Sequence, residues 1–233
     1  MPLAPRLESY LEPAVGNASS VLDVGCGANS PIGRFGRRIP YSVGVDAFRP
    51  AIEASRRTGL HSEYRELDIR HIEAAFEPDS FDVVVAFDVL EHLDPEDGLE
   101  LLASMEKIAR YRVIVLTPNG FLRQDVSDRN DLQEHRSGWS AEYLRKCGYD
   151  VRGLHGWRLL RGEKGSPRWR PGRIWGLVSD LTQPIVYRVP ELAFHLLAMK
   201  NPASASSSST SRTASEFERT LPQRRVGDPP RPH

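Results

Sequence analysis

The sequence predicts an α/β fold built on a parallel β-sheet. Short β-branched runs alternate with amphipathic stretches, which is the pattern of parallel strands joined by crossover helices. The first run, VLDV, leads directly into a glycine-rich stretch, and a later run, FDVVVAF, is apolar at nearly every position. A strand of that second kind is typical of a sheet centre, where both faces are covered.

Seven segments are predicted as strands, and two helices have clear boundaries. The predicted strands cover residues 20–24, 41–46, 63–67, 81–87, 112–117, 149–154 and 193–200. Asp94 is expected to cap a helix that has Pro95 at its first position. Ser140 is expected to cap a second helix, which Gly148 ends.

Length, net charge and cysteine content limit the kinds of protein that this chain can be. The chain of 233 residues suits one α/β domain with an appendage, and its net charge of +0 offers no global attraction for a nucleic acid. Two cysteines, Cys26 and Cys147, make neither a disulfide framework nor a metal knuckle. Neither a signal peptide nor an integral membrane segment is recognisable, so a cytoplasmic location is predicted.

The domain is predicted to end near residue 200. Residues 1–200 read as one domain, whereas residues 201–233 are serine-rich and then rich in proline and arginine. Such a segment has too few large apolar side chains to offset the entropy of ordering it. A disordered tail is therefore expected.

The glycine stretch after the first strand predicts a ligand site. Gly25 and Gly27 allow a sharp turn and close approach of a ligand, and Ser30 with Pro31 resembles a helix start facing an anionic group. A carboxylate and a pyrophosphate both fit there. A dinucleotide fingerprint needs glycine where Ser30 stands, and Asp23 would repel a pyrophosphate but hold an ammonium group. An amino-acid-like cofactor is therefore favoured.

Two further acids follow strands in register with this turn. Asp46 ends the second strand about 20 residues after the glycines, the offset at which an acid accepts hydrogen bonds from ribose hydroxyls. Asp68 follows the third strand and has the acceptor that an adenine amine needs. The alternative is that both are ordinary strand-end acids.

These motifs resemble those of class I S-adenosylmethionine-dependent methyltransferases of the type 11 or type 23 group. VLDVGCG, YSVGVDAF, RELDI, FDVVVAFDVLEHL and TPN carry the resemblance over about residues 18 to 155. Asn29 departs from it by replacing the third glycine of the turn, although asparagine tolerates a left-handed backbone. Rivals are an NAD- or nucleotide-sugar-dependent oxidoreductase, disfavoured by Ser30 and by the lack of a Tyr-x-x-x-Lys pair, and a catalytically silent adaptor.

The resemblance implies a Rossmann-like, seven-stranded sheet of order 3-2-1-4-5-7-6, mostly parallel with an antiparallel last strand. It identifies AFHLLAMK as that strand and S-adenosyl-L-methionine as the cofactor. The cofactor-binding residues are then predicted to be Asp23, Gly25, Cys26, Gly27, Asp46, Ala47, Asp68, Ile69 and Phe87.

The segment after the fourth strand bears on the acceptor. Methyltransferases acting on amides and nucleobase amines usually carry Asn/Asp-Pro-Pro-aromatic there, whereas this chain has AFDV. Glu91, His92 and the later His135 are predicted as catalytic, with His135 a base or substrate contact and no metal assigned. Asp88-x-x-Glu91-His92 also resembles the divalent-metal site of small-RNA 2′-O-methyltransferases and some ubiquinone-pathway O-methyltransferases. Alternatively, Asp88 caps a helix, Glu91 faces solvent and His92 only packs.

A basic segment at about residues 157–190 is predicted to be a partly helical insertion between the last two strands. It contains Arg158, Arg161, Lys164, Arg168, Arg170 and Arg173 against Glu163, with Trp157, Trp169 and Trp175 between them. An anionic-substrate or lipid-headgroup surface and a solvated basic loop over packing helices both fit. The prediction is methylation of a hydroxyl, less often a carbon or carboxylate, on a small, sugar- or lipid-linked metabolite. Peripheral membrane contact and oligomeric state stay open.

Overall fold

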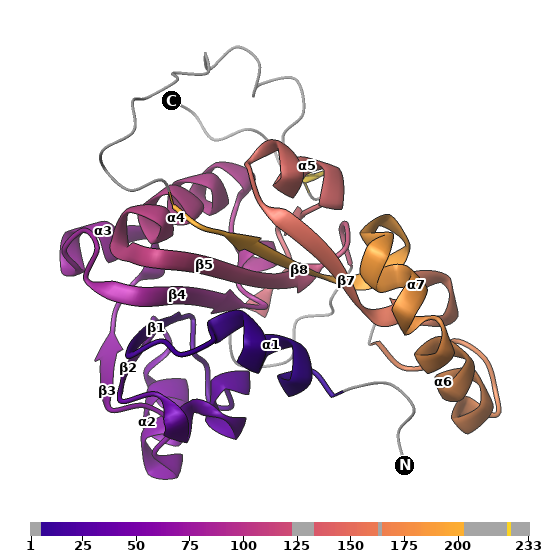
Figure 1. Cartoon of the computed structure of the whole chain (residues 1–233), viewed down its shortest axis with the longest axis horizontal. Helices are drawn as coiled ribbons and strands as arrows, with labels where there is room; N and C mark the ends of the chain where they lie inside the picture. Colours follow the sequence, from indigo (N-terminus) through magenta and orange to yellow (C-terminus); the bar gives the residue numbers. More distant parts are fainter. Residues whose placement is uncertain (1–5, 123–132, 163–164, 203–222, 225–233) are drawn as a thin grey trace.

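A seven-stranded mixed sheet organises the molecule, with strand order β3-β2-β1-β4-β5-β8-β7 (Figure 1). The computed structural model describes residues 6–122, 133–162, 165–202 and 223–224. The strands are β1 (Ser20–Val24), β2 (Tyr41–Asp46), β3 (Glu63–Glu66), β4 (Phe81–Phe87), β5 (Ala109–Pro118), β7 (Asp150–Trp157) and β8 (Ala193–Lys200). Strands β1 to β5 pair in parallel, and β8 is antiparallel to both β5 and β7. The predicted fold class is confirmed.

Helices cover both faces of the sheet. They are α1 (Glu8–Val15), α2 (Arg49–Thr58), α3 (Ile72–Ala75), α4 (Pro95–Ile108), α5 (Ala141–Lys146), α6 (Gly172–Leu181) and α7 (Gln183–Arg188). Leu101, Met105 and Ile108 of α4 are buried in the core cluster that α3 and α5 share, whereas α1 joins a second cluster on the other face. Alternate residues of β4, such as Val84 and Val85, divide between the two clusters because successive side chains of a strand point to opposite faces.

The glycine turn leads into a shorter helical segment than the sequence predicts. Ser30 does cap it, because its Oγ accepts a hydrogen bond from the N–H of Ile32 at 3.2 Å. The segment is only a four-residue 3₁₀ turn, η1 (Pro31–Arg34), and Gly33 and Gly36 explain its shortness through their low helix propensity. Among the described non-glycine residues, a positive φ occurs at Asp79, Asp88 and His155, so Asn29 does not use the left-handed conformation.

Strand β7 extends further than its hydrophobic pattern predicts. It continues to Trp157 through an irregularity between Leu154 and Trp157, where His155 has a φ of 64°. The next described elements, η6 (Arg158–Leu160), α6 and α7, lie between β7 and β8. The chain thus leaves the sheet at a bulge, and bulges commonly redirect side chains beside functional sites.

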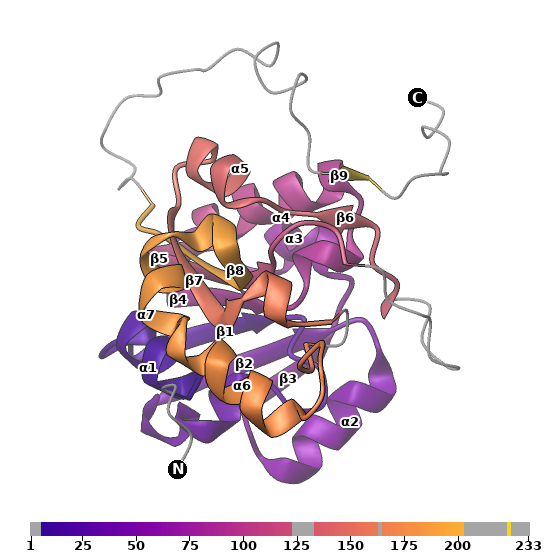
Figure 2. The same ribbon diagram turned by 90° about the vertical axis from the view of Figure 1, so that its right-hand side faces the viewer.

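Part of the predicted tail is paired. Gln223 and Arg224 form β9, which is antiparallel to Ser137 and Gly138 of β6 (Figure 2). The rest of the tail beyond residue 202 lies outside the described residues, so its disorder stays a prediction. None of the helices in the described part of the chain combines the length and the apolar character that crossing a membrane requires.

Candidate functional site

A cleft of about 700 Å³ opens at the carboxyl edge of the sheet. The loops after β1, β2, β3 and β4 form it, at the point between β1 and β4 where the strand order reverses. Open α/β sheets bind ligands at this topological position. Eight predicted cofactor residues line the cleft: Gly25, Cys26, Gly27, Asp46, Ala47, Asp68, Ile69 and Phe87.

The glycine turn forms one wall of the cleft. Gly25 and Gly27 have φ values of 68° and 56°, in the left-handed region that favours glycine. A Cβ at Gly25 would lie 2.6 Å from a methyl carbon of Val89, so the turn excludes a side chain there even without a ligand. Burial raises the pKa of the Cys26 thiol, which argues against a nucleophilic role for this residue.

Asp46 is held in place by the backbone of two loops. Its Oδ2 accepts a hydrogen bond from the N–H of Gly27 at 2.9 Å, and its Oδ1 accepts one from the N–H of Phe48 at 2.8 Å. Each carboxylate oxygen has a second lone pair for a further donor. The position therefore suits a ribose diol, although the contact itself stays a prediction.

Asp68 lies on the cleft wall but already has a charged partner. Arg70 donates from Nε to Oδ1 at 3.0 Å and from Nη2 to Oδ2 at 2.5 Å, and this hydrogen-bonded guanidinium lowers the pKa of Asp68. An adenine amine would have to share the carboxylate with Arg70. The predicted adenine contact stays a prediction.

Asp23 lies below the cleft and is not among the residues that line it. Its side chain is 1% exposed, and its carboxylate is 3.2 Å from Nε2 of His61, which is also buried. The sequence analysis did not identify His61. Its only sequence signal is that it is a polar residue shortly before the short strand β3. The predicted contact of Asp23 with an ammonium group stays a prediction that none of the described contacts supports.

The three predicted catalytic side chains come together beside this cleft. One ligand atom each from Glu91, His92 and His135 lies within 4.8 Å of the others. Glu91 is 2% exposed and accepts a hydrogen bond from Thr117 Oγ1 at 2.9 Å, so the solvent-facing alternative is wrong. Burial, with the nearby charge of Asp88, raises the pKa of Glu91 well above its usual range.

The two histidines present neutral imidazoles. Nδ1 of His92 lies 3.2 Å from the carbonyl oxygen of Glu134, and Nδ1 of His135 lies 2.8 Å from that of Leu122. These contacts assign the proton to Nδ1 in each ring and leave Nε2 with a lone pair. Burial lowers both pKa values, that of His92 to about 4 with a contribution from His135. Either Nε2 is thus available as a base near neutral pH.

The same donors fit a divalent cation. A carboxylate with two neutral imidazoles is a ligand set that zinc and related metals accept, and Nδ1–H groups held by carbonyls are the usual outer contacts of metal-bound histidine. The geometry of Glu91, His92 and His135 therefore fits two roles: a histidine base without a metal, and a site for a divalent cation.

Two residues near the cluster have structural roles. The Asn119 side-chain amide lies within 3.0 Å of the carbonyl oxygens of Pro190, Glu191 and Ala193, so the TPN motif holds the returning chain against the sheet. Trp139 is fully buried and packs against Gly98. This tryptophan therefore belongs to the core.

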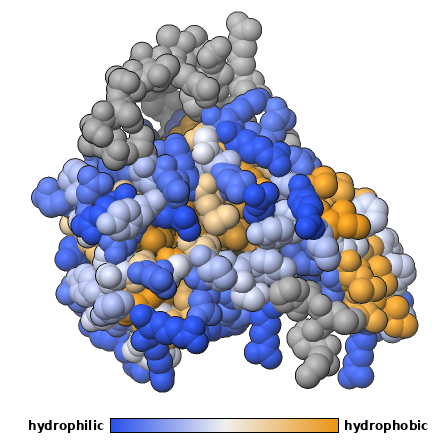
Figure 3. Space-filling model, viewed as in Figure 1, coloured by the Kyte–Doolittle hydropathy of each residue, from blue (hydrophilic) through white to orange (hydrophobic). Residues whose placement is uncertain are grey.

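The insertion exposes apolar side chains. Ile174, Leu177, Leu181 and Ile185 repeat at helical spacing along α6 and α7, and each is more than two-fifths exposed. We call these four residues the apolar ridge; Figure 3 shows a hydrophobic area where α6 and α7 lie. Arg168, Arg170 and Arg173 beside it are exposed as well, whereas Glu163 and Lys164 lie outside the described residues.

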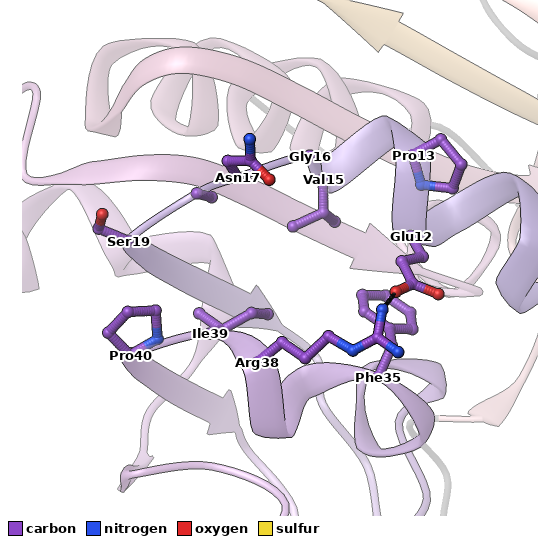
Figure 4. Close-up of a pocket in the computed structure, with 11 residues that line it drawn as sticks. Glu12, Pro13, Val15, Gly16, Asn17, Ser19, Phe35, Arg38, Ile39 and Pro40 are labelled. Atoms are coloured by element: carbon purple, nitrogen blue, oxygen red, sulfur yellow. Dashed lines mark hydrogen bonds and ion pairs between the residues drawn. The ribbon is translucent and has the colours of Figure 1, made fainter.

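A second cavity, of about 530 Å³, lies at the opposite edge of the sheet. Its lining includes Ser19 and Pro40, which precede β1 and β2, together with the ion-paired Glu12 and Arg38 (Figure 4). Because the amino ends of these strands point away from the glycine turn, the cavity is separate from the cofactor cleft.

Known proteins with similar sequences are methyltransferases. The methyltransferase domain family matches residues 22–122. A ubiquinone biosynthesis O-methyltransferase of Hahella chejuensis is 31% identical over 157 residues, which are 66% of this chain and 61% of the relative. One from Alkalilimnicola ehrlichii is 27% identical over 154 residues, 64% and 57% of the two chains. The chain thus spans about three-fifths of the length of these curated relatives.

Solved structures share the fold at low sequence identity. An S-adenosylmethionine-dependent methyltransferase from Archaeoglobus fulgidus superposes with a TM-score of 0.55 at 19% identity, covering 84% of this chain and 91% of that one. An O-methyltransferase family protein from Burkholderia thailandensis gives 0.54 at 15% identity, covering 86% and 57%. With its strand order and glycine turn, the chain has the Rossmann-like fold of class I S-adenosylmethionine-dependent methyltransferases, and residues 22–122 match the methyltransferase domain family.

Proposed function

We propose that this protein transfers the methyl group of S-adenosylmethionine to a hydroxyl oxygen of a small, lipid-linked acceptor. The observation that carries the proposal is a pair of neutral imidazoles: His92 lines the cofactor cleft, and the centroid of the His135 ring lies 4.9 Å from that of the His92 ring. A hydroxyl must lose its proton as it is methylated, and a neutral imidazole is suited to accept it. The two relatives are O-methyltransferases of ubiquinone biosynthesis, which supports an oxygen acceptor.

In the proposed reaction the acceptor oxygen attacks the methyl carbon while the carbon–sulfur bond breaks and its electron pair passes to sulfur. The enzyme has to hold the two reactants in line and remove one proton. Asp46 and the glycine turn would hold the cofactor, and Nε2 of His135 would take the proton or orient the hydroxyl. If a divalent cation binds Glu91, His92 and His135 instead, it would orient the hydroxyl and lower its pKa.

A lipid-linked acceptor fits the surface of the insertion. The exposed Arg168, Arg170 and Arg173 precede or begin α6, the helix that carries most of the apolar ridge, and basic and apolar side chains are combined in this way on helices that rest on anionic membranes. Helices packed only against the sheet would bury these side chains. We therefore propose that the protein contacts an anionic lipid surface peripherally and that the acceptor reaches the cleft from this surface. The cytoplasmic location stays a prediction.

Methylation of 4-methylcatechol, a neutral ring with two hydroxyls, tests the reaction. We expect a methyl ether as product by mass spectrometry and NMR, together with S-adenosylhomocysteine. A matched thiol, amine and carboxylate on the same ring serve as controls. Tight binding of S-adenosylhomocysteine without turnover of any hydroxyl acceptor would contradict the proposal and favour the silent adaptor.

Vesicle co-sedimentation tests the membrane contact. We expect the wild type to sediment with vesicles containing phosphatidylglycerol and the double variant Ile174→Asp/Leu181→Asp to remain largely in the supernatant. Tyr111→Asp, which changes an exposed aromatic residue on β5, is the matched control and should behave like the wild type. A wild type that stays in the supernatant, or a Tyr111→Asp variant that loses binding equally, would argue against the ridge.

A further inference from the structure

Three side chains outside the predicted catalytic set form a chain toward the cleft. Nε2 of His195 in β8 lies 3.4 Å from Oδ1 of Asp88, the residue that follows β4. Nδ1 of the same His195 lies 2.9 Å from Nδ1 of His155 in β7. We call Asp88, His195 and His155 the acid–histidine chain; the register that places Leu154 opposite His195 brings its two histidines together.

The two end residues of the acid–histidine chain, Asp88 and His155, have a strained backbone conformation. Asp88 and His155 have φ values of 54° and 64°, and Asp79 is the one other described non-glycine residue with a positive φ. A non-glycine residue in this conformation is strained and persists only where the surrounding contacts enforce it. The N–H of Asp88 donates to the carbonyl of Leu116, and the N–H of Gly156, next to His155, donates to Gln183.

The pattern of donors and acceptors gives the chain a direction. If Nε2–H of His195 points to the carboxylate of Asp88, then Nδ1 of His195 is an acceptor and receives the Nδ1–H of His155. Both nitrogens of His195 are then occupied, so this ring does not reach a substrate. The Asp88 side chain is 51% exposed and lines the cleft with His92. Its carboxylate is therefore the end of the chain that faces a ligand.

We infer that Asp88 binds the methyl acceptor by accepting a hydrogen bond from an acceptor hydroxyl, and that His195 and His155 position its carboxylate. This inference rests on the proposed function and extends it, because it adds a recognition group for the acceptor on the cleft that His92 also lines. It also links acceptor binding to the insertion, since the two residues after His155 donate backbone hydrogen bonds to Gln183 and Thr182 of that segment.

Steady-state kinetics with 4-methylcatechol test the binding role. Asp88→Ala should raise KM about 10- to 100-fold, the effect of losing a hydrogen bond to a charged group, with a smaller change in kcat. Affinity for S-adenosylhomocysteine should stay within about twofold, and Asp88→Asn, which keeps an acceptor oxygen, should fall between. Asp79→Ala is the matched control, because it removes an aspartate at the same φ away from the cleft.

The positioning role has its own variants. His195→Gln keeps an N–H where Nε2 lies and should preserve most of the acceptor affinity, whereas His195→Phe should raise KM several-fold. His155→Phe should have a smaller effect in the same direction. Long-range ¹H–¹⁵N spectra of the histidine side chains give a readout without turnover: Asp88→Ala should shift the His195 nitrogens, and Asp79→Ala should not.

The outcomes separate the two proposals. If the wild type methylates the catechol and Asp88→Ala keeps its KM, the binding role of Asp88 is overturned while the proposed function stands. Equal kinetics of His195→Gln and His195→Phe, with unmoved ¹⁵N shifts in Asp88→Ala, would overturn the positioning chain. A wild type that binds S-adenosylhomocysteine but methylates no hydroxyl acceptor overturns the proposed function and the inference with it.

Discussion

The two halves of the site are built in different ways. On the cofactor side, the ligand groups follow β1, β2 and β3 directly, and local backbone contacts fix them, as with Asp46 and Gly27. On the side proposed to hold the acceptor, His135 packs against His92 and His155 contacts His195, and the residues of each pair come from distant parts of the chain. The cofactor half is therefore a property of short motifs, whereas the acceptor half is a property of the assembled sheet.

This difference predicts separable defects. Changes in the cofactor half should weaken cofactor binding, and changes in the acceptor half should slow turnover or weaken acceptor binding while cofactor binding persists. A variant that mixes the two effects would show that the halves are coupled.

The largest effect is expected for His135→Ala. Loss of the base or orienting group should lower kcat by roughly 10²- to 10⁴-fold with cofactor affinity intact. His71→Ala, at an exposed histidine, is the control. Chelator decides the role of the residue: activity lost in EDTA and restored by Mg²⁺, Mn²⁺ or Zn²⁺ indicates the metal site, and activity insensitive to EDTA indicates the free base. Full activity of the variant would show that His135 is neither a base nor a metal ligand and only packs in its loop.

Gly25→Val should be the most damaging change in the cofactor half. Its Cβ meets Val89 at 2.6 Å and its φ is 68°, so we expect affinity for S-adenosylhomocysteine to fall at least about 100-fold by calorimetry. Gly59→Val has a similar φ of 64° with nothing within 4 Å of the added Cβ, so it separates backbone strain from the collision. Tight binding by a folded Gly25→Val protein would refute the placement of the turn.

Asp46→Ala should have a more moderate effect on the same equilibrium. Removing the carboxylate leaves two backbone N–H groups and the ribose hydroxyls without their acceptor, which should weaken binding by about 2 to 3 kcal/mol. Asp46→Asn keeps one acceptor oxygen and should lose less. Calorimetry that finds unchanged affinity in both variants would remove the ribose assignment.

The acceptor half should also control the acid stability of the fold. Burial first, then a neighbouring histidine, lowers the pKa of His92 and of His155 from 6.5 to about 4, so the unfolded chain takes up protons that the folded protein does not as the pH falls through this range. The free energy of unfolding should therefore decrease toward low pH. Glu91 acts oppositely, because its raised pKa lets the folded protein bind a proton first.

Urea denaturation at several pH values checks these signs. His92→Gln/His155→Gln should flatten the acid loss of stability, and Glu91→Gln should steepen it by removing the compensating proton uptake. Parallel curves for all three proteins would mean that these groups titrate alike in the folded and unfolded states.

The smallest effect is expected from truncation after Pro202. The removed segment is poor in large apolar groups, and its described pairing with the domain is the two-residue strand β9. The melting temperature and the cofactor affinity should remain nearly unchanged in scanning fluorimetry and calorimetry. A drop of many degrees would show that the tail packs on the domain and that β6, next to His135, depends on it.

Two features of the structure differ from what the sequence predicted or left open. The helix after Ser30 is a short 3₁₀ turn, because the glycines that follow do not favour a helix. Glu91 is buried against Thr117, which lies 26 residues further along the chain. No local sequence pattern indicates that Gly98 leaves room for the Trp139 ring, or that Asp88 lies next to His195 of β8.

The sequence by itself determined the α/β class and the position of the glycine turn, because strands, glycine turns and the acids that end strands are set by neighbouring residues. Its resemblance to known methyltransferases implied the strand order and the cofactor residues, eight of which line the cleft. Only the tertiary structure decided that Asp23 is buried against His61, that the apolar ridge is exposed, and that Asp88, His195 and His155 meet. These contacts depend on strand register and packing between distant segments, because burial and hydrogen-bond partners are set by the whole fold.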